Sequence, residues 1–306
     1  MQIIALYLAV VLIWGSTWIA ISFQLGVVAA EVSVGYRFGI AAIVLYIYAL
    51  ATGRQVLLPR GAYPMIVLQG SLLFCLNYFF VYYGTAYLTT GLVAVLFSTI
   101  ILANAFFELL LFKTPMDKQL IIASAFGITG IAMVFWPEVA ALTFEDDVVV
   151  GIALVLISVV IASLGNMTAV VNTRRTLPVV TVNAHAMAWA ALLALSIAAL
   201  LGREFNFSMQ TSYIVSLAYL AVLGSAVAFG FYLALIRRIG AARAAYSSVL
   251  FPVVALAIST FAEGYQWTLT AGVGILLALT GNWLVLSRGK PLVKATFDQV
   301  GGRINE

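Results

Sequence analysis

The stretch from Pro137 to Gly151 reads Pro-Glu-Val-Ala-Ala-Leu-Thr-Phe-Glu-Asp-Asp-Val-Val-Val-Gly and separates two long apolar parts of the chain. It holds four of the eleven acidic residues and no Lys or Arg. A segment this acidic is costly in a bilayer, whereas the runs on both sides are too apolar to leave one. We therefore predict an extracytoplasmic hinge over residues 141–148, between membrane-embedded halves over 1–140 and 149–288, with a cytoplasmic tail over 289–306.

The composition excludes a soluble protein. Hydrophobic residues make up 64% of the chain and charged residues only 8%, against about one-quarter charged in soluble domains. The apolar runs are continuous rather than alternating, so they predict helices and not a transmembrane β-barrel. The sequence thus predicts an all-α integral membrane protein with ten transmembrane helices. The predicted spans are 3–23, 32–52, 63–83, 90–112, 118–136, 149–171, 179–201, 211–236, 241–262 and 268–287.

The basic residues predict the orientation of these spans, because cytoplasmic loops are enriched in Lys and Arg. Thirteen of the fifteen Lys and Arg fall on one side, and only Arg37 and Arg203 do not. The thirteen are Arg54, Arg60, Lys113, Lys118, Arg174, Arg175, Arg237, Arg238, Arg243, Arg288, Lys290, Lys294 and Arg303. Both termini are therefore predicted to be cytoplasmic, with the acidic hinge outside.

The second half echoes the first in order and spacing. Val32-Ser33-Val34 and Val180-Thr181-Val182 open the second and seventh predicted spans, 148 residues apart. Phe97-Ser98-Thr99-Ile100 matches Tyr246-Ser247-Ser248-Val249 at an offset of 149 residues. Thr129-Gly130 matches Thr280-Gly281 at 151, and Gly15-Ser16 matches Gly165-Asn166 more loosely at 150. Chance similarity among apolar helices is the alternative, but the near-constant spacing favours a duplication. Because each half has an odd number of spans, the copies would be inverted, as in carriers whose substrate site lies near the bilayer midplane.

Aromatic and polar residues inside the first and third spans are candidates for lining such a site. Trp14, Ser16 and Trp18 lie in the run Trp-Gly-Ser-Thr-Trp, with the two Trp four residues apart on one helical face. Tyr78 and Tyr82 likewise share a face, and Asn77 offers both a donor and an acceptor. The functional interpretation is a stacking wall for a flat, apolar substrate. The structural alternative is helix packing, or residence in the interfacial aromatic belt.

Other spans add weakly polar candidates. Ser98, Asn166, Tyr246 and Ser247 fall at repeat-related positions of the fourth, sixth and ninth spans. Pro252, inside the ninth span, predicts a kink that either shapes a cavity or acts as a pivot. The predicted cavity is aromatic, weakly polar and nearly uncharged.

Three ionisable residues are candidates for gating or for pairing with charge. Arg37 and His185 lie at repeat-related positions, near the outer end of one span and the inner end of the other. They could bind a carboxylate or form gates. The structural alternative is that each extends to the interface or bonds carbonyl groups. Glu108 could carry a coupling proton or pair with the nearby Lys113. No predicted span has a carboxylate at mid-depth, which disfavours mechanisms driven by a buried acid.

The sequence lacks the motifs of most other functional classes. It has one cysteine, Cys75, one histidine, His185, and no phosphate-binding glycine loop, so metal, nucleotide and haem sites are not predicted. The net charge of +4 is explained by topology rather than by nucleic-acid binding. We predict no cofactor, no metal and no enzymatic activity, because no nucleophile, base and acid come together.

The residues also resemble a known family of membrane carriers. Four features resemble the EamA family of the drug/metabolite transporter superfamily. They are Ile-Trp-Gly-Ser-Thr-Trp in the first span, the Tyr83 to Gly91 turn, Pro252, and Glu-Gly-Tyr-Gln-Trp-Thr-Leu-Thr-Ala-Gly over 263–272, which is followed nine residues on by Gly281. Overall similarity is greatest to exporters of aromatic amino acids of the YddG type. The resemblance implies a bacterial inner-membrane carrier whose cavity is lined by spans one to four and six to nine. The chain departs from the pattern where Ala103 aligns with Pro252 and Lys113 stands near the place of a loop Glu.

Together these features predict a secondary transporter that exports aromatic or neutral amino acids and related small metabolites by alternating access. Its partners would be an amino acid substrate and the lipid bilayer, with a proton or no coupling ion, as a monomer or weak homodimer. Within the superfamily the alternatives are a carrier of sugar phosphates or nucleotide-sugars and a multidrug exporter. The first would need several basic residues inside the bundle, and the second a deep carboxylate.

Overall fold

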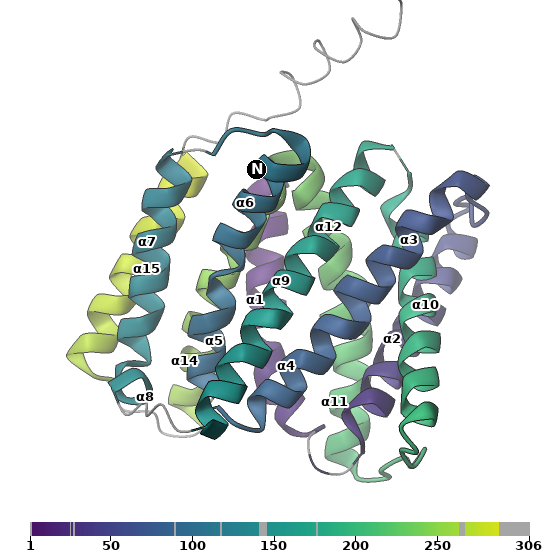
Figure 1. Cartoon of the computed structure of the whole chain (residues 1–306), viewed down its shortest axis with the longest axis horizontal. Coiled ribbons are helices and arrows are strands. Elements are labelled where there is room, and N and C mark those ends of the chain that lie inside the picture. The colour runs from purple at the N-terminus through teal and green to yellow at the C-terminus, as the bar shows by residue number, and fades with distance from the viewer. Residues whose placement is uncertain are drawn as a thin grey trace, which may run out of the picture.

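The computed structural model describes residues 2–24, 26, 28–88, 90–116, 118–140, 146–175, 177–262 and 267–287. These residues form helices and connecting turns with no β-strand among them, which confirms the predicted all-α class. The helices stand side by side in one bundle (Figure 1). Residues 141–145 of the predicted hinge, residues 263–266 and the predicted tail lie outside the described part of the chain.

Helical segments fill both halves of the chain. The first half contains α1 (Gln2–Ser22), α2 (Ala30–Ala51), α3 (Tyr63–Gln69), α4 (Asn77–Thr85), α5 (Thr90–Ser98), α6 (Ile100–Phe112), α7 (Lys118–Val134) and the short α8 (Trp136–Ala140). The second contains α9 (Asp146–Arg174), α10 (Val179–Leu200), α11 (Thr211–Ala221), α12 (Ala228–Ile239), α13 (Ala241–Ala245), α14 (Phe251–Ala262) and α15 (Leu269–Ser287). Short irregular helices, η1 (Arg60–Ala62), η2 (Gly70–Leu76), η3 (Val222–Val227) and η4 (Tyr246–Leu250), join some of them.

Seven helical stretches among the described residues are long and apolar enough to cross a membrane. They are Ala30–Ala51, Arg60–Thr85, Val95–Phe112, Asp147–Arg174, Val179–Leu200, Thr211–Ile239 and Ala241–Ile258. Three shorter apolar helices, over Gln2–Thr17, Lys118–Val134 and Leu269–Val285, accompany them. A bundle of this composition is a membrane protein, because its apolar outer surface suits lipid.

The packing has two tight helix pairs at the edges and two helices in the middle. α7 lies along α15 at the left edge of Figure 1, and α2 lies along α10 at the right. Between them α1 packs against α12 and α14, while α9 packs against α4 and α6. Glycines allow the closest approach: a Cβ on Gly130 would lie 2.5 Å from the carbonyl oxygen of Gly274, and the reverse distance is also 2.5 Å. Small residues commonly set such crossings in membranes.

Several long helical spans contain a π-helical or 3₁₀-helical segment between α-helical segments. The segments η2 and η3 are π-helices, a rare form that often marks functional sites. The chain also turns at Thr99 between α5 and α6, and η4 is a 3₁₀ segment that leads into α14. Pro252 is the second residue of α14, directly after the 3₁₀ segment η4, where a missing N–H is tolerated.

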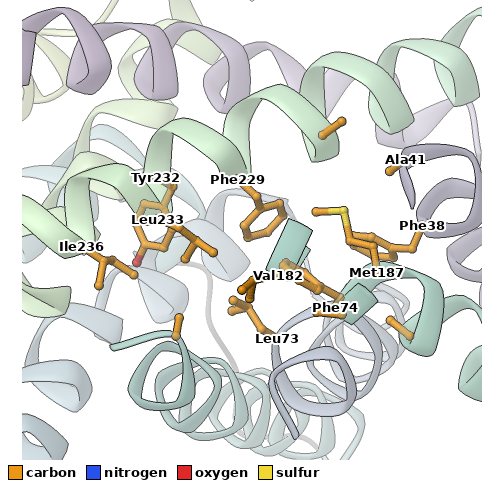
Figure 2. Packing of buried hydrophobic residues seen from close by; sticks show 14 of the residues in the cluster. Phe38, Ala41, Leu73, Phe74, Val182, Met187, Phe229, Tyr232, Leu233 and Ile236 are labelled. Atoms are coloured by element: carbon orange, nitrogen blue, oxygen red, sulfur yellow. The ribbon is translucent and has the colours of Figure 1, made fainter. Parts of the chain in front are cut away.

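The buried core lies where the two π-helical spans face each other. Phe229 and Tyr232 on α12 point across the core toward Leu73 and Phe74 of η2 (Figure 2). The rings of Phe74 and Phe229 stand edge to face with centroids 4.7 Å apart, a favourable aromatic geometry. Leu73, Phe229 and Tyr232 of this layer also line the cavity described next.

Candidate functional site

A cavity of about 140 Å³ is lined by residues of both halves of the chain. It is lined by Trp14, Thr17, Ile21, Arg37, Leu73, Asn77, Tyr78, Val81, Tyr82, Phe97, Ile100, Ala162, Asn166, Phe229, Tyr232, Ala245, Ser247, Ser248 and Phe251. These residues come from α1, α2, η2, α4, α5, α6, α9, α12, α13, η4 and α14. The family resemblance implied a contribution from the 179–201 span as well, but α10 supplies none of the described lining residues, because it lies along α2.

Trp14 forms the centre of an aromatic wall. Its ring lies 4.7 Å from that of Phe229, 5.0 Å from that of Tyr232 and 5.6 Å from that of Phe251, measured between centroids. A half-buried indole N–H needs an acceptor, and Nε1 donates to the carbonyl oxygen of Gly224 in η3 at 2.9 Å. The ring is therefore held by edge contacts and one hydrogen bond. Such a wall can stack against a flat apolar ligand.

Arg37 brings a positive charge into this apolar space. Its side chain is only 3% exposed, and its Nε donates to the Ser225 hydroxyl at 2.9 Å. The guanidinium carbon lies 4.9 Å from the centre of the Tyr78 ring, a cation–π distance. Its Nη1 is buried without a hydrogen-bond partner, and no described carboxylate lies within ion-pair distance. A buried guanidinium without an ion pair among the described residues is costly and suits a carboxylate ligand.

Asn166 of α9 presents a second unpartnered group. The side chain is 1% exposed, its Nδ2 donates to Asn104 Oδ1 at 3.3 Å, and its Oδ1 is buried without a partner. Asn104 Oδ1 also accepts from the Ser163 hydroxyl at 2.7 Å. The neighbouring Ser248 hydroxyl of the lining is likewise buried without a partner. The cavity thus offers hydrogen-bonding groups that the protein itself leaves unused.

Of the residues predicted from the sequence, seven line this cavity. They are Trp14, Arg37, Asn77, Tyr78, Tyr82, Asn166 and Ser247. Asn77 Nδ2 donates to the Leu73 carbonyl at 3.1 Å, and Ser247 donates to the Ala244 carbonyl at 2.8 Å, so both also hold the local backbone. The side chain of Trp18 lies outside the described part of the structure.

Three other predicted residues form hydrogen bonds away from the cavity lining. The Ser16 hydroxyl contacts the Tyr219 hydroxyl at 2.6 Å, and the Ser98 hydroxyl donates to the Val95 carbonyl at 2.6 Å. Tyr246 is fully buried against α7, where its hydroxyl donates to the carbonyl of Ala123. The contacts of Ser16 and Tyr246 join different helices, whereas Ser98 bonds a carbonyl of its own helix, so all three side chains hold structure in this conformation.

His185 and Glu108 are also engaged elsewhere. His185 Nδ1 lies 2.9 Å from the Thr181 carbonyl oxygen, and the ring packs edge to face on Tyr46 and Tyr63. Glu108 accepts from the backbone N–H of Ala241 at 2.6 Å and so caps the start of α13. No ion pair joins Glu108 to Lys113 among the described residues. Neither side chain lines the cavity.

Glu31, on the same helix as Arg37, bonds two residues from other parts of the chain. Glu31, only 1% exposed, forms an ion pair with Arg203 at 3.2 Å and accepts a hydrogen bond from the Tyr83 hydroxyl at 2.5 Å. The carboxylate raises the pKa of Arg203, which lies in the connection after α10. Glu31 is therefore paired with Arg203, and no described carboxylate pairs with Arg37.

Replacement of Tyr246 by Phe tests the distinction between packing and lining residues. We expect Tyr246→Phe to lower the free energy of unfolding by about 1–3 kcal/mol, since the buried carbonyl of Ala123 loses its donor. The KM for any transported substrate should not change. Thermal unfolding of the purified protein and transport kinetics together check this. A changed KM at unchanged stability would place Tyr246 in the substrate site.

The sequence reasoning missed several lining residues, chiefly Phe229, Tyr232 and Phe251. Phe229 and Tyr232 belong to the cluster Phe-Gly-Phe-Tyr of the eighth span, which follows the Asn-Tyr-Phe-Phe cluster at 77–80 by about one repeat length. Applying the repeat offset to Tyr78 would have pointed to them. Ser248 was missed because a lone hydroxyl in an apolar run usually bonds its own helix.

Comparison with known proteins agrees with this architecture. The sequence profile of the EamA-like transporter family matches residues 1–136 and 149–287. The chain is 23% identical over 296 residues to Protein PagO of Salmonella typhimurium (strain LT2), with 96% of each chain covered. It also resembles a protein of known crystal structure with a TM-score of 0.79 at 16% identity, covering 93% of this chain and 96% of the other. That likeness concerns the fold alone.

The chain belongs to the EamA-like transporter family, within the drug/metabolite transporter superfamily. Members of this family are transporters rather than enzymes, and the apolar helices place the protein in a membrane. The cavity is thus the natural candidate for a transport site.

Proposed function

We propose that the protein is a secondary carrier that exports aromatic and neutral amino acids and related small metabolites by alternating access through this cavity. One observation carries the proposal: Arg37 is buried in the cavity wall among aromatic rings, with no carboxylate partner among the described residues. An aromatic amino acid supplies what that site lacks, a carboxylate for the guanidinium and a flat side chain for the wall of Trp14 and Tyr78.

The architecture proposed for this carrier is ten spans in two inverted five-helix repeats, and the packing supports it. The pairs α2 with α10 and α7 with α15 each join equivalent helices of the two halves. The contacts of α1 with α12 and α14 correspond to those of α9 with α4 and α6 when the halves are exchanged. A two-fold axis in the membrane plane would produce this correspondence.

Local details support the same relation. A Cβ on Gly130 would lie 2.5 Å from the carbonyl oxygen of Gly274, and one on Gly281 would lie 2.7 Å from that of Ala123. An offset of 151 residues turns the first contact into the second. The π-helices η2 and η3 also begin at corresponding places, Gly70 and Val222.

The proposed location is a bacterial inner membrane, with both termini in the cytoplasm. In Figure 1 the N-terminus and the end of α15 lie at the same end of the bundle, and α9 begins at the opposite end. The basic connections predicted from the sequence then face the cytoplasm. This arrangement fits an exporter that loads its substrate from inside the cell.

The cavity disfavours the two alternatives within the superfamily. Sugar phosphates and nucleotide-sugars carry two negative charges, yet Arg37 is the single Lys or Arg among the described lining residues. Cationic drugs call for a carboxylate, and the described lining contains neither Asp nor Glu. One positive charge in an aromatic pocket matches a monocarboxylate better than either.

The stacking role is tested with the double variant Trp14→Ala, Tyr78→Ala. We expect export of radiolabelled tryptophan from proteoliposomes to fall at least about tenfold, because two aromatic contacts are lost. The matched control is Trp189→Ala, Tyr46→Ala, which removes the same two residue types from α10 and α2 outside the cavity lining. Export at the wild-type rate by the Trp14 and Tyr78 variant would refute the proposed wall.

A further inference from the structure

The cavity keeps unused hydrogen-bonding atoms in two separate places. One is Nη1 of Arg37, a donor, and the other is Oδ1 of Asn166, an acceptor. Both side chains are at least 97% buried and both line the cavity, being 3% and 1% exposed. The hydroxyl of Ser248 is a third unpartnered group, but a hydroxyl can turn to donate or to accept and therefore imposes no selection.

A chain of hydrogen bonds fixes which atom of Asn166 faces the ligand. The carbonyl oxygen of Ala241 can only accept, and Asn104 Nδ2 donates to it at 3.3 Å. Asn104 Oδ1 must then point the other way, where it receives Nδ2 of Asn166 at 3.3 Å and the hydroxyl of Ser163 at 2.7 Å. The atom of Asn166 that is left over is its carbonyl oxygen, a pure acceptor.

The two sites lie at different levels of the helical span Thr211–Ile239. Arg37 donates to Ser225, and the Asn166 amide lies beside the hydroxyl of Tyr232. Ser225 and Tyr232 stand seven residues apart on the same helical span, so their Cα atoms are separated by roughly 10 Å along its axis. The ammonium and carboxylate of an amino acid are carried by one carbon atom. A substrate that binds Arg37 through its carboxylate would extend its side chain along the cavity toward Asn166.

On the basis of the proposed function, we propose that Asn166 is a specificity-determining residue that accepts a hydrogen bond from that tip. The indole N–H of tryptophan and the phenol O–H of tyrosine are donors at the far end of an aromatic side chain. Phenylalanine has the same body with no donor and would leave the buried acceptor unpaired. A site built to bond a polar substrate group rejects the analogue that lacks it. The carrier thus selects donor-tipped aromatic amino acids.

The first test uses the wild-type protein in proteoliposomes and measures kcat/KM for L-tyrosine, L-tryptophan, L-phenylalanine and O-methyl-L-tyrosine. We expect tyrosine and tryptophan to exceed phenylalanine and O-methyltyrosine by about tenfold, the worth of one buried hydrogen bond. Equal transport of tyrosine and phenylalanine would overturn this inference while leaving the proposed export of amino acids intact. Transport of none of the four would overturn both.

The second test compares Asn166→Leu with Asn172→Leu. Asn172 lies on the same helix, is 2% exposed and also has a buried, unpartnered Oδ1, but it does not line the cavity. We expect Asn166→Leu to lower transport of tyrosine and tryptophan about tenfold and to leave phenylalanine unchanged. Asn172→Leu should keep the wild-type ratio. Retained phenylalanine transport shows that the variant is folded. A ratio of tyrosine to phenylalanine that Asn166→Leu leaves at the wild-type value would contradict the assignment.

Discussion

Replacing Arg37 with Gln is expected to lower kcat/KM for tryptophan export by roughly 10- to 100-fold, the worth of a hydrogen bond to a charged group. Arg37 is the one basic residue of the described cavity lining, and its Nη1 has no hydrogen-bond partner in the described part of the chain. The loss should appear in transport and not in folding. Because the variant removes a buried charge without an ion-pair partner, the melting temperature should equal or exceed that of the wild type.

Two controls separate this effect from a general loss of positive charge. Arg54→Gln removes an exposed arginine that contacts only the face of Tyr48 in the described contacts, and it should leave export unchanged. Indole, which has neither a carboxylate nor a charge, should bind wild-type and Arg37→Gln proteins alike in a competition assay. Export of tryptophan at the wild-type rate by Arg37→Gln would remove the observation on which the proposed function rests.

Gly274→Ala is expected to lower the free energy of unfolding by about 3 kcal/mol, the upper end for overpacking. The added Cβ would lie 2.5 Å from the carbonyl oxygen of Gly130 and 2.9 Å from the backbone nitrogen of Val134. Backbone atoms cannot move aside as a flexible side chain can, so α7 and α15 would have to separate. Thermal unfolding in detergent, followed by size-exclusion chromatography, measures the change.

The matched control lies two residues away on the same helix. A Cβ on Gly272 would meet no atom within 4 Å, so Gly272→Ala should be neutral or slightly stabilising through its helix propensity. If both variants had the same melting temperature, the close contact between α7 and α15 could not be a determinant of stability.

The helices were predictable from the sequence because apolar runs of span length have few alternatives in a bilayer. The run 149–171, for example, lies within the longer helix Asp146–Arg174. The π-helices η2 and η3 were not predictable, since neither Gly70–Leu76 nor Val222–Val227 has a local signal for them. Such winding depends on how neighbouring helices pack.

The lining of the cavity was predictable only where the sequence itself fixes a face. Tyr78 and Tyr82, four residues apart, both line it, as a shared helical face requires. Tyr246 and Ser247 are adjacent, yet Ser247 lines the cavity while Tyr246 bonds α7. One residue in a 3₁₀ segment turns the side chain by about 120°, and hydropathy does not encode which way the span is rotated. The hydrogen-bond chain through Asn104 is equally invisible before folding.

Accessibility of the cavity from the two sides of the membrane tests the central claim most directly. Ser247 lines the cavity and can be replaced by Cys with little change of shape, after Cys75, the one native cysteine, is changed to Ala. A membrane-impermeant maleimide is then applied from one side or the other of oriented proteoliposomes, with and without tryptophan. We predict that Ser247→Cys reacts from either side and that tryptophan slows both reactions. Reaction from one side only, or no protection by tryptophan, would contradict a single substrate cavity that opens alternately to the two faces.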